Sequence, residues 1–269
     1  LNNSMNVNDN IMYFCYRIFS KFIDCASYRD KISYIASKQV GFKKTALGFD
    51  TAVLLNFPFT ENINNTSRSI KNNKIIIAVN LTAIHKHYFG KIEPDYKIVN
   101  IIVMSIINIM ELYDNVLFRL FIFNTGSKSW DAWIAKELIK HIPLHLRSRI
   151  SCVIYDGRLD KLLTELANTD VVIASKFHSQ LFAYILGKPF ISLALHPKNI
   201  YFAYDIDVSK ETIIDIKDLS EYVLTEKLIK LIDSLKNFEF LNFMPKLPIN
   251  VARKRAYNGI YSCLQRILL

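Results

Sequence analysis

Residues 170–198, DVVIASKFHSQLFAYILGKPFISLALHPK, have the pattern of a strand, a helix and a second strand, with a polar loop after each strand. Residues 170–174 form a short apolar run rich in β-branched side chains, which is typical of a central parallel strand buried on both faces. Residues 190–195 form a second such run, and Pro189 stands at its start, where a strand tolerates proline. The stretch therefore predicts a βαβ unit.

The helix between these strands is expected to begin at Ser175, a good N-cap residue, and to end at Gly187. Its apolar face, at helical spacing, comprises Leu181, Phe182, Ile185 and Leu186. In a βαβ unit the carboxyl ends of both strands face the same edge of the sheet, where ligands usually bind. Four basic side chains follow the two strands and are expected at this edge: Lys176, His178, His196 and Lys198.

The same alternation extends in both directions along the chain. Strands are predicted at 75–81, 116–123, 150–155 and 212–216. Helices are predicted at 95–113, 129–141, 158–167 and 218–236, with a last amphipathic helix after residue 245. Alternating strands and helices indicate an α/β fold with a doubly wound, Rossmann-like parallel sheet.

The amino-terminal part has a weaker pattern. Residues 11–24 fit a helix or a strand, Asp30 is the expected N-cap of a short helix, and residues 45–55 read as strand or extended chain. We expect a partial N-terminal α/β domain on the acceptor side (1–60), a linker (61–73), a Rossmann-like domain with the donor site (74–240) and a C-terminal helix (241–269). Because no complete βαβ pattern precedes residue 28, we expect the chain to begin partway through a domain.

Composition narrows the class of partner. Apolar residues make up 51% of the 269-residue chain, which is ample for a buried core. The net charge of +10 favours an anionic partner, but the basic residues are spread out and form no dense run. We therefore expect an anionic substrate and no nucleic acid.

Several familiar sites are missing from the sequence. Neither GxGxxG nor GxxxxGK[ST] occurs, so a dinucleotide or P-loop site is not expected. The four cysteines form no CxxC pair, and His85-x-His87 has no matching Cys or carboxylate partners, so we expect no metal and no cofactor. The cysteine pattern also fits a reducing compartment, and the longest apolar stretch, 98–110, is too short for a membrane span of about 20 residues.

The residues after the two central strands favour a compact dianion such as a phosphate monoester. Lys176 and His178 share a helix N-terminus, which attracts anions through its N–H groups and dipole, and Lys198 adds a further cation. Taken singly, each residue also fits an ordinary role, as a solvated loop lysine or a histidine near a helix start.

These residues resemble the polysaccharide pyruvyl transferases. The likeness rests on Ser175-Lys176-Phe177-His178, Ala183, Gly187-x-Pro189 and Lys198, together with upstream Arg29-Asp30, Ser33 and Asp50. It covers roughly residues 27–240. Lys176 stands where the family has arginine, and the family's glycine-rich amino-terminal strand and loop are absent.

The resemblance implies a two-domain, GT-B-like architecture with the substrate cleft between the domains. It implies transfer of a pyruvyl group from phosphoenolpyruvate to a hydroxyl of a glycan or lipid-linked sugar, forming a ketal of a cell-surface polysaccharide. His178 is the candidate general acid and base, since its unperturbed pKa lies near neutrality. The candidate substrate-binding residues are Asn80, Ser175, Lys176, His196 and Lys198.

Two alternatives stay open. A GT-B glycosyltransferase would present the same helix N-terminus to the diphosphate of a nucleotide sugar and would need a carboxylate for the ribose, for which Asp156 and Asp205 are options. A degenerate relative would bind a glycan or a protein without turnover. Under the transferase reading we expect a cytoplasmic enzyme, with peripheral association at the inner face of the membrane left open.

Overall fold

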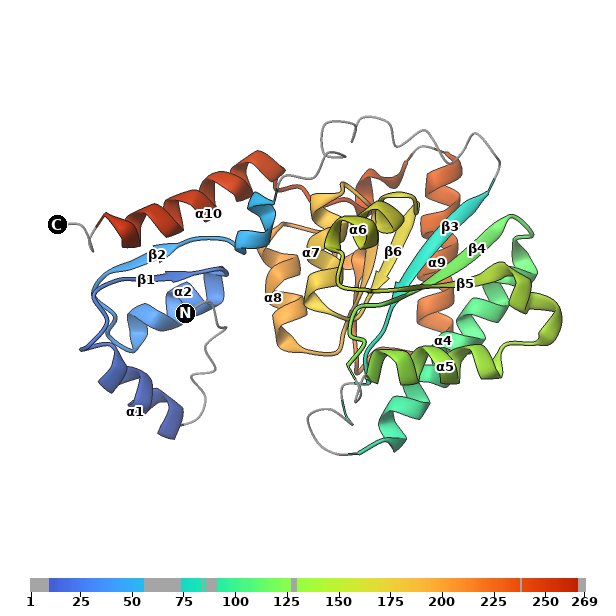
Figure 1. The fold of residues 1–269 in the computed structure, drawn as a ribbon, viewed down its shortest axis with the longest axis horizontal. Coiled ribbons are helices and arrows are strands. Elements are labelled where there is room, and N and C mark those ends of the chain that lie inside the picture. Colours follow the sequence, from blue (N-terminus) through green and yellow to red (C-terminus); the bar gives the residue numbers. More distant parts are fainter. Residues whose placement is uncertain are drawn as a thin grey trace. The chain divides into compact units, whose positions relative to one another are not determined.

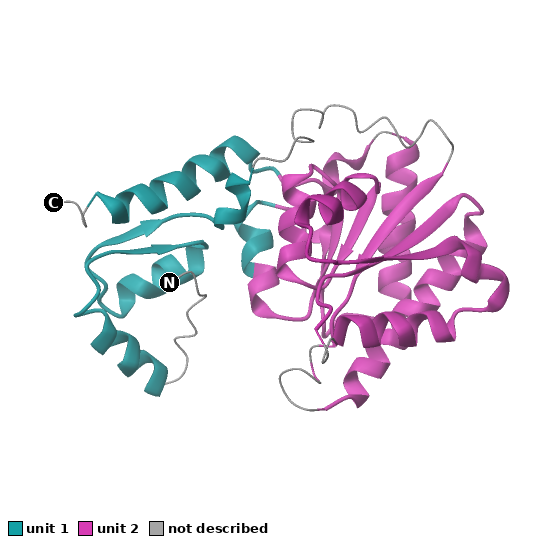
Figure 2. Ribbon diagram, in the orientation of Figure 1, with its two compact units in different colours: residues 1–56, 201–207, 246–269 teal, residues 57–200, 208–245 magenta. Residues whose placement is uncertain are grey.

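The computed structural model describes residues 10–55, 74–83, 85, 91–126, 130–237 and 239–265. They belong to two compact units, shown in Figure 2. Unit 1 comprises residues 1–56, 201–207 and 246–269, and unit 2 comprises residues 57–200 and 208–245. The C-terminal helix thus belongs to the same unit as the amino-terminal part, whereas the sequence suggested a separate C-terminal helix. The predicted boundaries stay a prediction, and the predicted linker lies outside the described residues.

Unit 2 is built on a six-stranded parallel sheet (Figure 1). Its strands are β3 (Ile75–Asn80), β4 (Val116–Ile122), β5 (Ile150–Ile154), β6 (Val171–Ala174), β7 (Phe190–Ala194) and β8 (Ile213–Asp215). They lie in the order β5-β4-β3-β6-β7-β8, and every neighbouring pair is parallel. The predicted doubly wound sheet is therefore confirmed, because the chain builds outward from β3 in one direction and then returns to build outward in the other.

Five helices follow the strands of this sheet as predicted: α4 (Glu93–Leu112), α5 (Trp130–His141), α6 (Leu159–Ala167), α7 (Phe177–Ile185) and α9 (Glu221–Lys236). The helix α8 (Pro197–Asp205) was not predicted, and its residues 201–205 belong to unit 1. Short 3-10 turns occur at η4 (Leu144–Arg149), η5 (Lys210–Thr212) and η6 (Phe240–Phe243). Each α-helix predicted from residue 95 onward is present, with ends shifted by a few residues.

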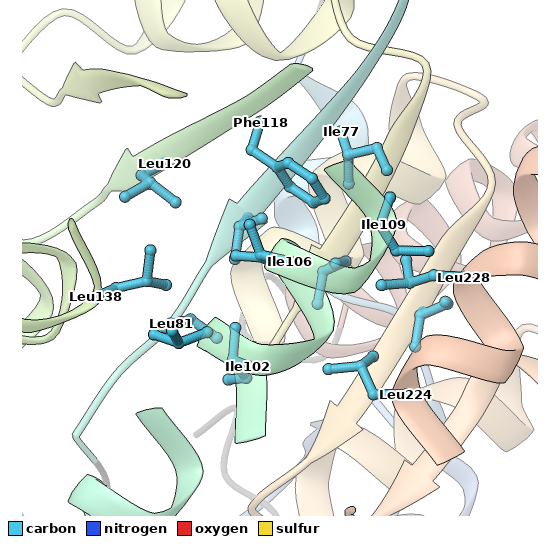
Figure 3. Close-up of a cluster of buried hydrophobic side chains, with 14 of the residues drawn as sticks. Ile77, Leu81, Ile102, Ile106, Ile109, Phe118, Leu120, Leu138, Leu224 and Leu228 are labelled. Atoms are coloured by element: carbon cyan, nitrogen blue, oxygen red, sulfur yellow. The ribbon is translucent and has the colours of Figure 1, made fainter. Parts of the chain in front are cut away.

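The main hydrophobic core lies between the sheet and the helices α4, α5 and α9. Figure 3 shows Ile102, Ile106 and Ile109 of α4 among side chains of the strands and of α9. Leu224 and Leu228 of α9 are completely buried there. Since these side chains recur at helical spacing, the amphipathic pattern of α4 and α9 directs both helices onto the sheet.

One predicted helix start was wrong. Ser175 was expected to cap α7, but Lys176 is the N-cap residue and its side chain makes no capping hydrogen bond. The reason is that the Ser175 N–H donates to the carbonyl of Asn80 (3.0 Å), which keeps Ser175 in the ladder between β3 and β6. Gly187, expected just after the helix, has a φ of 61°, a backbone conformation that glycine adopts without strain.

Unit 1 contains a two-stranded parallel sheet of β1 (Ala26–Tyr28) and β2 (Thr45–Leu47). Its other elements are α1 (Asn10–Phe19), α2 (Lys31–Gln39), the turn η1 (Thr51–Leu54) and α10 (Ile249–Leu264). Residues 11–24, left open between helix and strand, are thus helical up to Phe19.

The four residues of the amino-terminal motif, Arg29, Asp30, Ser33 and Asp50, hold local structure in unit 1. Asp30 caps α2 as predicted, because its Oδ1 accepts the Ser33 N–H (2.7 Å) and its Oδ2 accepts the Ser33 hydroxyl (2.8 Å). Arg29 donates to Asp50 (3.3 Å), and Asp50 also caps η1 through the N–H of Ala52 (3.0 Å). These contacts order the loops that follow β1 and β2.

Candidate functional site

A cavity of about 220 Å³ lies in unit 2 at the carboxyl ends of β3, β4, β6 and β7. Strand order reverses between β3 and β6, and ligands of open α/β sheets bind in the crevice at such a reversal. The lining residues come from the segments that follow these four strands: Thr82, Asn124, Trp130, Asp131, Ser175, Lys176, Phe177, His178, His196, Lys198 and Asn199.

Five of the six predicted site residues line this cavity, namely Ser175, Lys176, His178, His196 and Lys198. Asn80 does not. It lies buried at the end of β3, where its side-chain amide donates to the carbonyl of Phe121 (2.8 Å) and so joins β3 to β4. The prediction that both loops of the central βαβ unit meet at one edge of the sheet is therefore confirmed. Asn80 does not line this cavity, and the substrate-binding roles of all six residues stay predictions.

Lys176 forms an ion pair that sequence reasoning missed. Its Nζ donates to Oδ2 of Asp131 (2.5 Å), and the same oxygen accepts the backbone N–H of Asn124 (3.1 Å). The Asp131 side chain is only 2% exposed, whereas that of Lys176 is 23% exposed. Part of the Lys176 charge is thus balanced by a buried carboxylate, so this wall of the cavity is less cationic than the sequence indicated.

The only sequence signal for Asp131 is its position in the first turn of α5, where acidic residues are common. Its partner lies 45 residues away, so no local pattern links the two. Asn199 was missed for the same reason: its amide donates to the carbonyl of Ser175 across 24 residues (2.8 Å). This bond joins the start of α8 to the end of β6.

Two buried polar atoms at the cavity have no hydrogen-bond partner among the described residues: the Ser175 hydroxyl and Oδ1 of Asn199. Buried polar groups are normally paired, because leaving one unpaired costs about 1–3 kcal/mol. The hydroxyl can donate to an anion. Ser175 directly precedes Lys176, the N-cap residue of α7, whose side chain makes no capping hydrogen bond to the helix N-terminus. This corner of the cavity therefore has the donors of an anion site.

His196 is held in one tautomer. Its Nδ1 accepts the backbone N–H of Lys198 (3.2 Å), and since an N–H only donates, Nδ1 carries no proton. Burial lowers the pKa of His196, and the nearby ammonium of Lys198 lowers it further. His196 is therefore neutral at pH 7 and offers its Nε2–H as a donor, not a positive charge.

His178 is the lining histidine open to solvent. It lies in the first turn of α7, and its ring contacts those of Phe177 (5.4 Å between centroids) and Phe182 (6.3 Å). Its exposed position suits a group that exchanges protons with a substrate.

Neither predicted ribose carboxylate lines the cavity. Asp156 pairs with Arg158 (2.8 Å) and Lys161 (3.1 Å), and these two partners lower the pKa of its carboxyl group. Asp205 belongs to unit 1, where it accepts from Arg255 (2.9 Å). The ribose contact expected of a nucleotide-sugar site is therefore not supplied by either residue at this cavity.

In the described ranges, no group of three or more His, Cys, Asp and Glu side chains is placed to hold a metal ion. His87 lies outside the described residues, and His85 contacts Asp95 through Nδ1 (3.1 Å). No helix within the described part of the chain has the length and hydrophobicity to cross a membrane.

Comparison with known proteins gives one family. The family model described as polysaccharide pyruvyl transferase matches residues 4–197, which include α7, β7 and most of the cavity lining. None of the curated protein sequences gives a significant match to the chain.

Several solved structures share the fold. A putative UDP-N-acetylglucosamine 2-epimerase from Listeria monocytogenes matches with a TM-score of 0.58 and 13% identity, over 93% of this chain and 62% of its own. The UDP-GlcNAc 2-epimerase of Methanocaldococcus jannaschii gives 0.56 and 18%, over 93% and 63%. Anabaena HepE, solved with UDP and glucose, gives 0.56 and 13%, over 100% and 69%.

These neighbours have the GT-B fold, so the predicted GT-B-like α/β class is confirmed. The chain spans less than two thirds of the length of the Listeria and Methanocaldococcus enzymes. At identities of 13–18% the likeness establishes the fold, and it leaves the chemistry to the residues of the site.

We expect substitutions of Lys176 and Asp131 to have coupled effects on the free energy of unfolding. Replacing Lys176 by Met leaves a buried carboxylate without its ammonium partner and should lower the free energy of unfolding by about 2 kcal/mol. Adding Asp131→Asn should recover at least about 1 kcal/mol of that loss, as measured by guanidinium denaturation. The surface pair Lys230 and Glu226 is the matched control and should show no measurable coupling. Additive effects of Lys176→Met and Asp131→Asn would contradict the ion pair.

The lowered pKa of His196 predicts a pH effect on stability. The unfolded state takes up a proton near pH 6.5, whereas the folded state takes it up only at lower pH. The contribution of His196 is therefore complete above pH 6.5 and is lost as the pH falls below that value. His196→Asn, which keeps a polar acceptor but does not titrate, should flatten the slope of unfolding free energy between pH 7 and 5. Identical slopes for both proteins would show that His196 does not titrate differently on folding.

Proposed function

Since the chain belongs to the polysaccharide pyruvyl transferase family, we propose that it transfers a pyruvyl group from phosphoenolpyruvate to a sugar hydroxyl. The acceptor would be a glycan or lipid-linked precursor of a cell-surface polysaccharide, and the product a pyruvate ketal. The observation that carries this proposal is the cavity at the β3–β6 reversal, where Ser175, Lys198 and the uncapped start of α7 meet beside an exposed His178.

The charge at the cavity suits a small anion. Phosphoenolpyruvate carries a phosphate and a carboxylate, and Lys198, the Ser175 hydroxyl and the α7 N-terminus supply donors for one such group. Lys176 supplies further positive charge, reduced by its pairing with Asp131. The volume of about 220 Å³ lies below the roughly 300–1,000 Å³ usual for larger ligands, which favours a compact donor.

The proposed reaction moves protons at two sugar hydroxyls and at C3 of phosphoenolpyruvate. The first sugar hydroxyl loses a proton as its oxygen attacks C2 of phosphoenolpyruvate, and C3 gains a proton as the methylene becomes a methyl group. A second hydroxyl then loses its proton as its oxygen bonds to C2 and closes the ketal. In that step the bond between C2 and the phosphate oxygen breaks, and the leaving inorganic phosphate takes up the proton. His178 is the candidate for these transfers, because an imidazole both accepts and donates near neutral pH.

We assign Asp131 a positioning role in this scheme. Its carboxylate holds the Lys176 ammonium at one wall of the cavity and also binds the N–H of Asn124 in the loop after β4. A lysine has a flexible stem and lacks the planar fork of the arginine found in the family, so a fixed partner offsets part of that difference. The ion pair thus places a point charge where the family has a bidentate group.

A nucleotide sugar is the second candidate ligand. The Neisseria meningitidis UDP-GlcNAc 2-epimerase was solved with UDP-GlcNAc, and its structure matches this chain with a TM-score of 0.59 and 13% identity, over 94% of this chain and 63% of its own. The size of the cavity and the pairing of Asp156 and Asp205 with other residues favour phosphoenolpyruvate. A degenerate relative that binds a glycan or a protein without turnover would bind neither compound.

The binding test is calorimetric titration with phosphoenolpyruvate, with UDP-GlcNAc as the comparison ligand. Saturable binding of phosphoenolpyruvate is expected, and Lys198→Ala should weaken it about 10-fold or more by removing a charge-assisted contact. Lys140→Ala on α5, whose side chain is 67% exposed, is the matched control and should bind as the unmodified protein does. Binding of UDP-GlcNAc alone would replace the proposal with a nucleotide-sugar enzyme.

The catalytic test uses His178→Gln. This change removes a group that gains and loses protons but keeps a polar side chain of similar size, so phosphoenolpyruvate affinity should change less than about 3-fold. Phosphate release from phosphoenolpyruvate in the presence of oligosaccharide acceptors should fall about 100-fold or more. If the variant turns over at the unmodified rate, His178 is not the acid or base.

A further inference from the structure

Two cysteines that are far apart in the sequence meet in unit 1. Cys25 directly precedes β1, and Cys263 lies in the last turn of α10, 238 residues later. Their Sγ atoms are 2.6 Å apart, and Sγ of Cys25 also contacts the carbonyl of Ser262 (3.6 Å). The sequence predicted no such pair, because cysteine spacing carries no signal for contacts across a whole chain.

The packing of α10 explains why the two thiols meet. Gly259, one turn before Cys263, lies directly against the β1–β2 sheet: a Cβ added there would come within 2.9 Å of the Gly48 Cα. The same Cβ would come within 2.3 Å of Oγ of Ser27. Only a glycine allows this approach, and it brings the following turn of the helix to the start of β1.

We propose that Cys25 and Cys263 form a reversible disulfide that fastens α10 to β1. Both residues are partly exposed, so a small oxidant reaches them. Their Sγ atoms are already in contact, so the disulfide forms without a large movement of α10 or β1. The oxidant class is a low-molecular-weight disulfide. This modification goes beyond the proposed transferase activity and does not depend on it.

The reaction balances as two thiol–disulfide exchanges. The thiolate of one cysteine attacks the oxidant disulfide, its S–S bond breaks, and one small thiol leaves while a mixed disulfide forms on the protein. The second cysteine, as thiolate, then attacks the protein sulfur of that mixed disulfide and releases the second small thiol. Two electrons pass from the cysteine pair to the oxidant, and the two protons end on the released thiols.

The test uses the full chain carrying Cys15→Ser and Cys152→Ser, which keeps only the proposed pair. In a buffer of oxidised and reduced glutathione, mass spectrometry should find a loss of two hydrogens and a peptide cross-link between residues 25 and 263. Cross-linking should be about 10-fold faster in the folded protein than in guanidinium, where the two ends rarely meet. The melting temperature of the cross-linked protein should rise by about 5 °C.

The matched control carries Cys25→Ser and Cys263→Ser and retains Cys15 and Cys152. It should gain glutathione at these positions without an internal cross-link. Glutathione attached separately to Cys25 and Cys263 in the folded test protein, or equal cross-linking rates in folded and denatured protein, would overturn the proposal.

Discussion

The hydrogen bonds between β3 and β6 join two halves of the sheet that the chain builds in opposite directions. After β3 the chain adds β4 and β5 on one side, and after β6 it adds β7 and β8 on the other. The loops that leave β3 and β6 must therefore diverge, and the crevice between them is where polar side chains gather. The cavity, the start of α7 and the bond from Asn199 to Ser175 all depend on this one pairing.

The electrostatics of the cavity follow from burial more than from the number of basic residues. Lys176 has a buried carboxylate beside it, and His196 is kept neutral by burial and by the N–H that its Nδ1 accepts. The sequence indicates a strongly cationic cavity. In the folded protein the cavity also contains a carboxylate and a neutral histidine, so its charge is lower. Specific donors, such as the Ser175 hydroxyl, then have as much weight in recognising an anion as the net charge does.

The sequence was sufficient for the features that depend on local pattern. The parallel strands, the helices that follow them and the convergence of Lys176, His178, His196 and Lys198 all follow from periodicity and from the geometry of a βαβ unit. It was insufficient where a contact joins distant segments. Asp131 reaches Lys176 from another helix, and Asn80 turned inward because its amide completes a bond to β4. The N-cap shifted by one residue because a ladder hydrogen bond competed with capping.

The division of unit 1 among three separate stretches of chain has a consequence for synthesis on the ribosome. Residues 10–55 are made before unit 2, whereas α10, which packs on β1, β2 and η1, is made only after the whole of unit 2. All strands of unit 2 have therefore been synthesised at a time when α10 of unit 1 has not. Residues 10–55 must stay unaggregated during that interval. The order of translation therefore favours folding of unit 2 before unit 1 is completed.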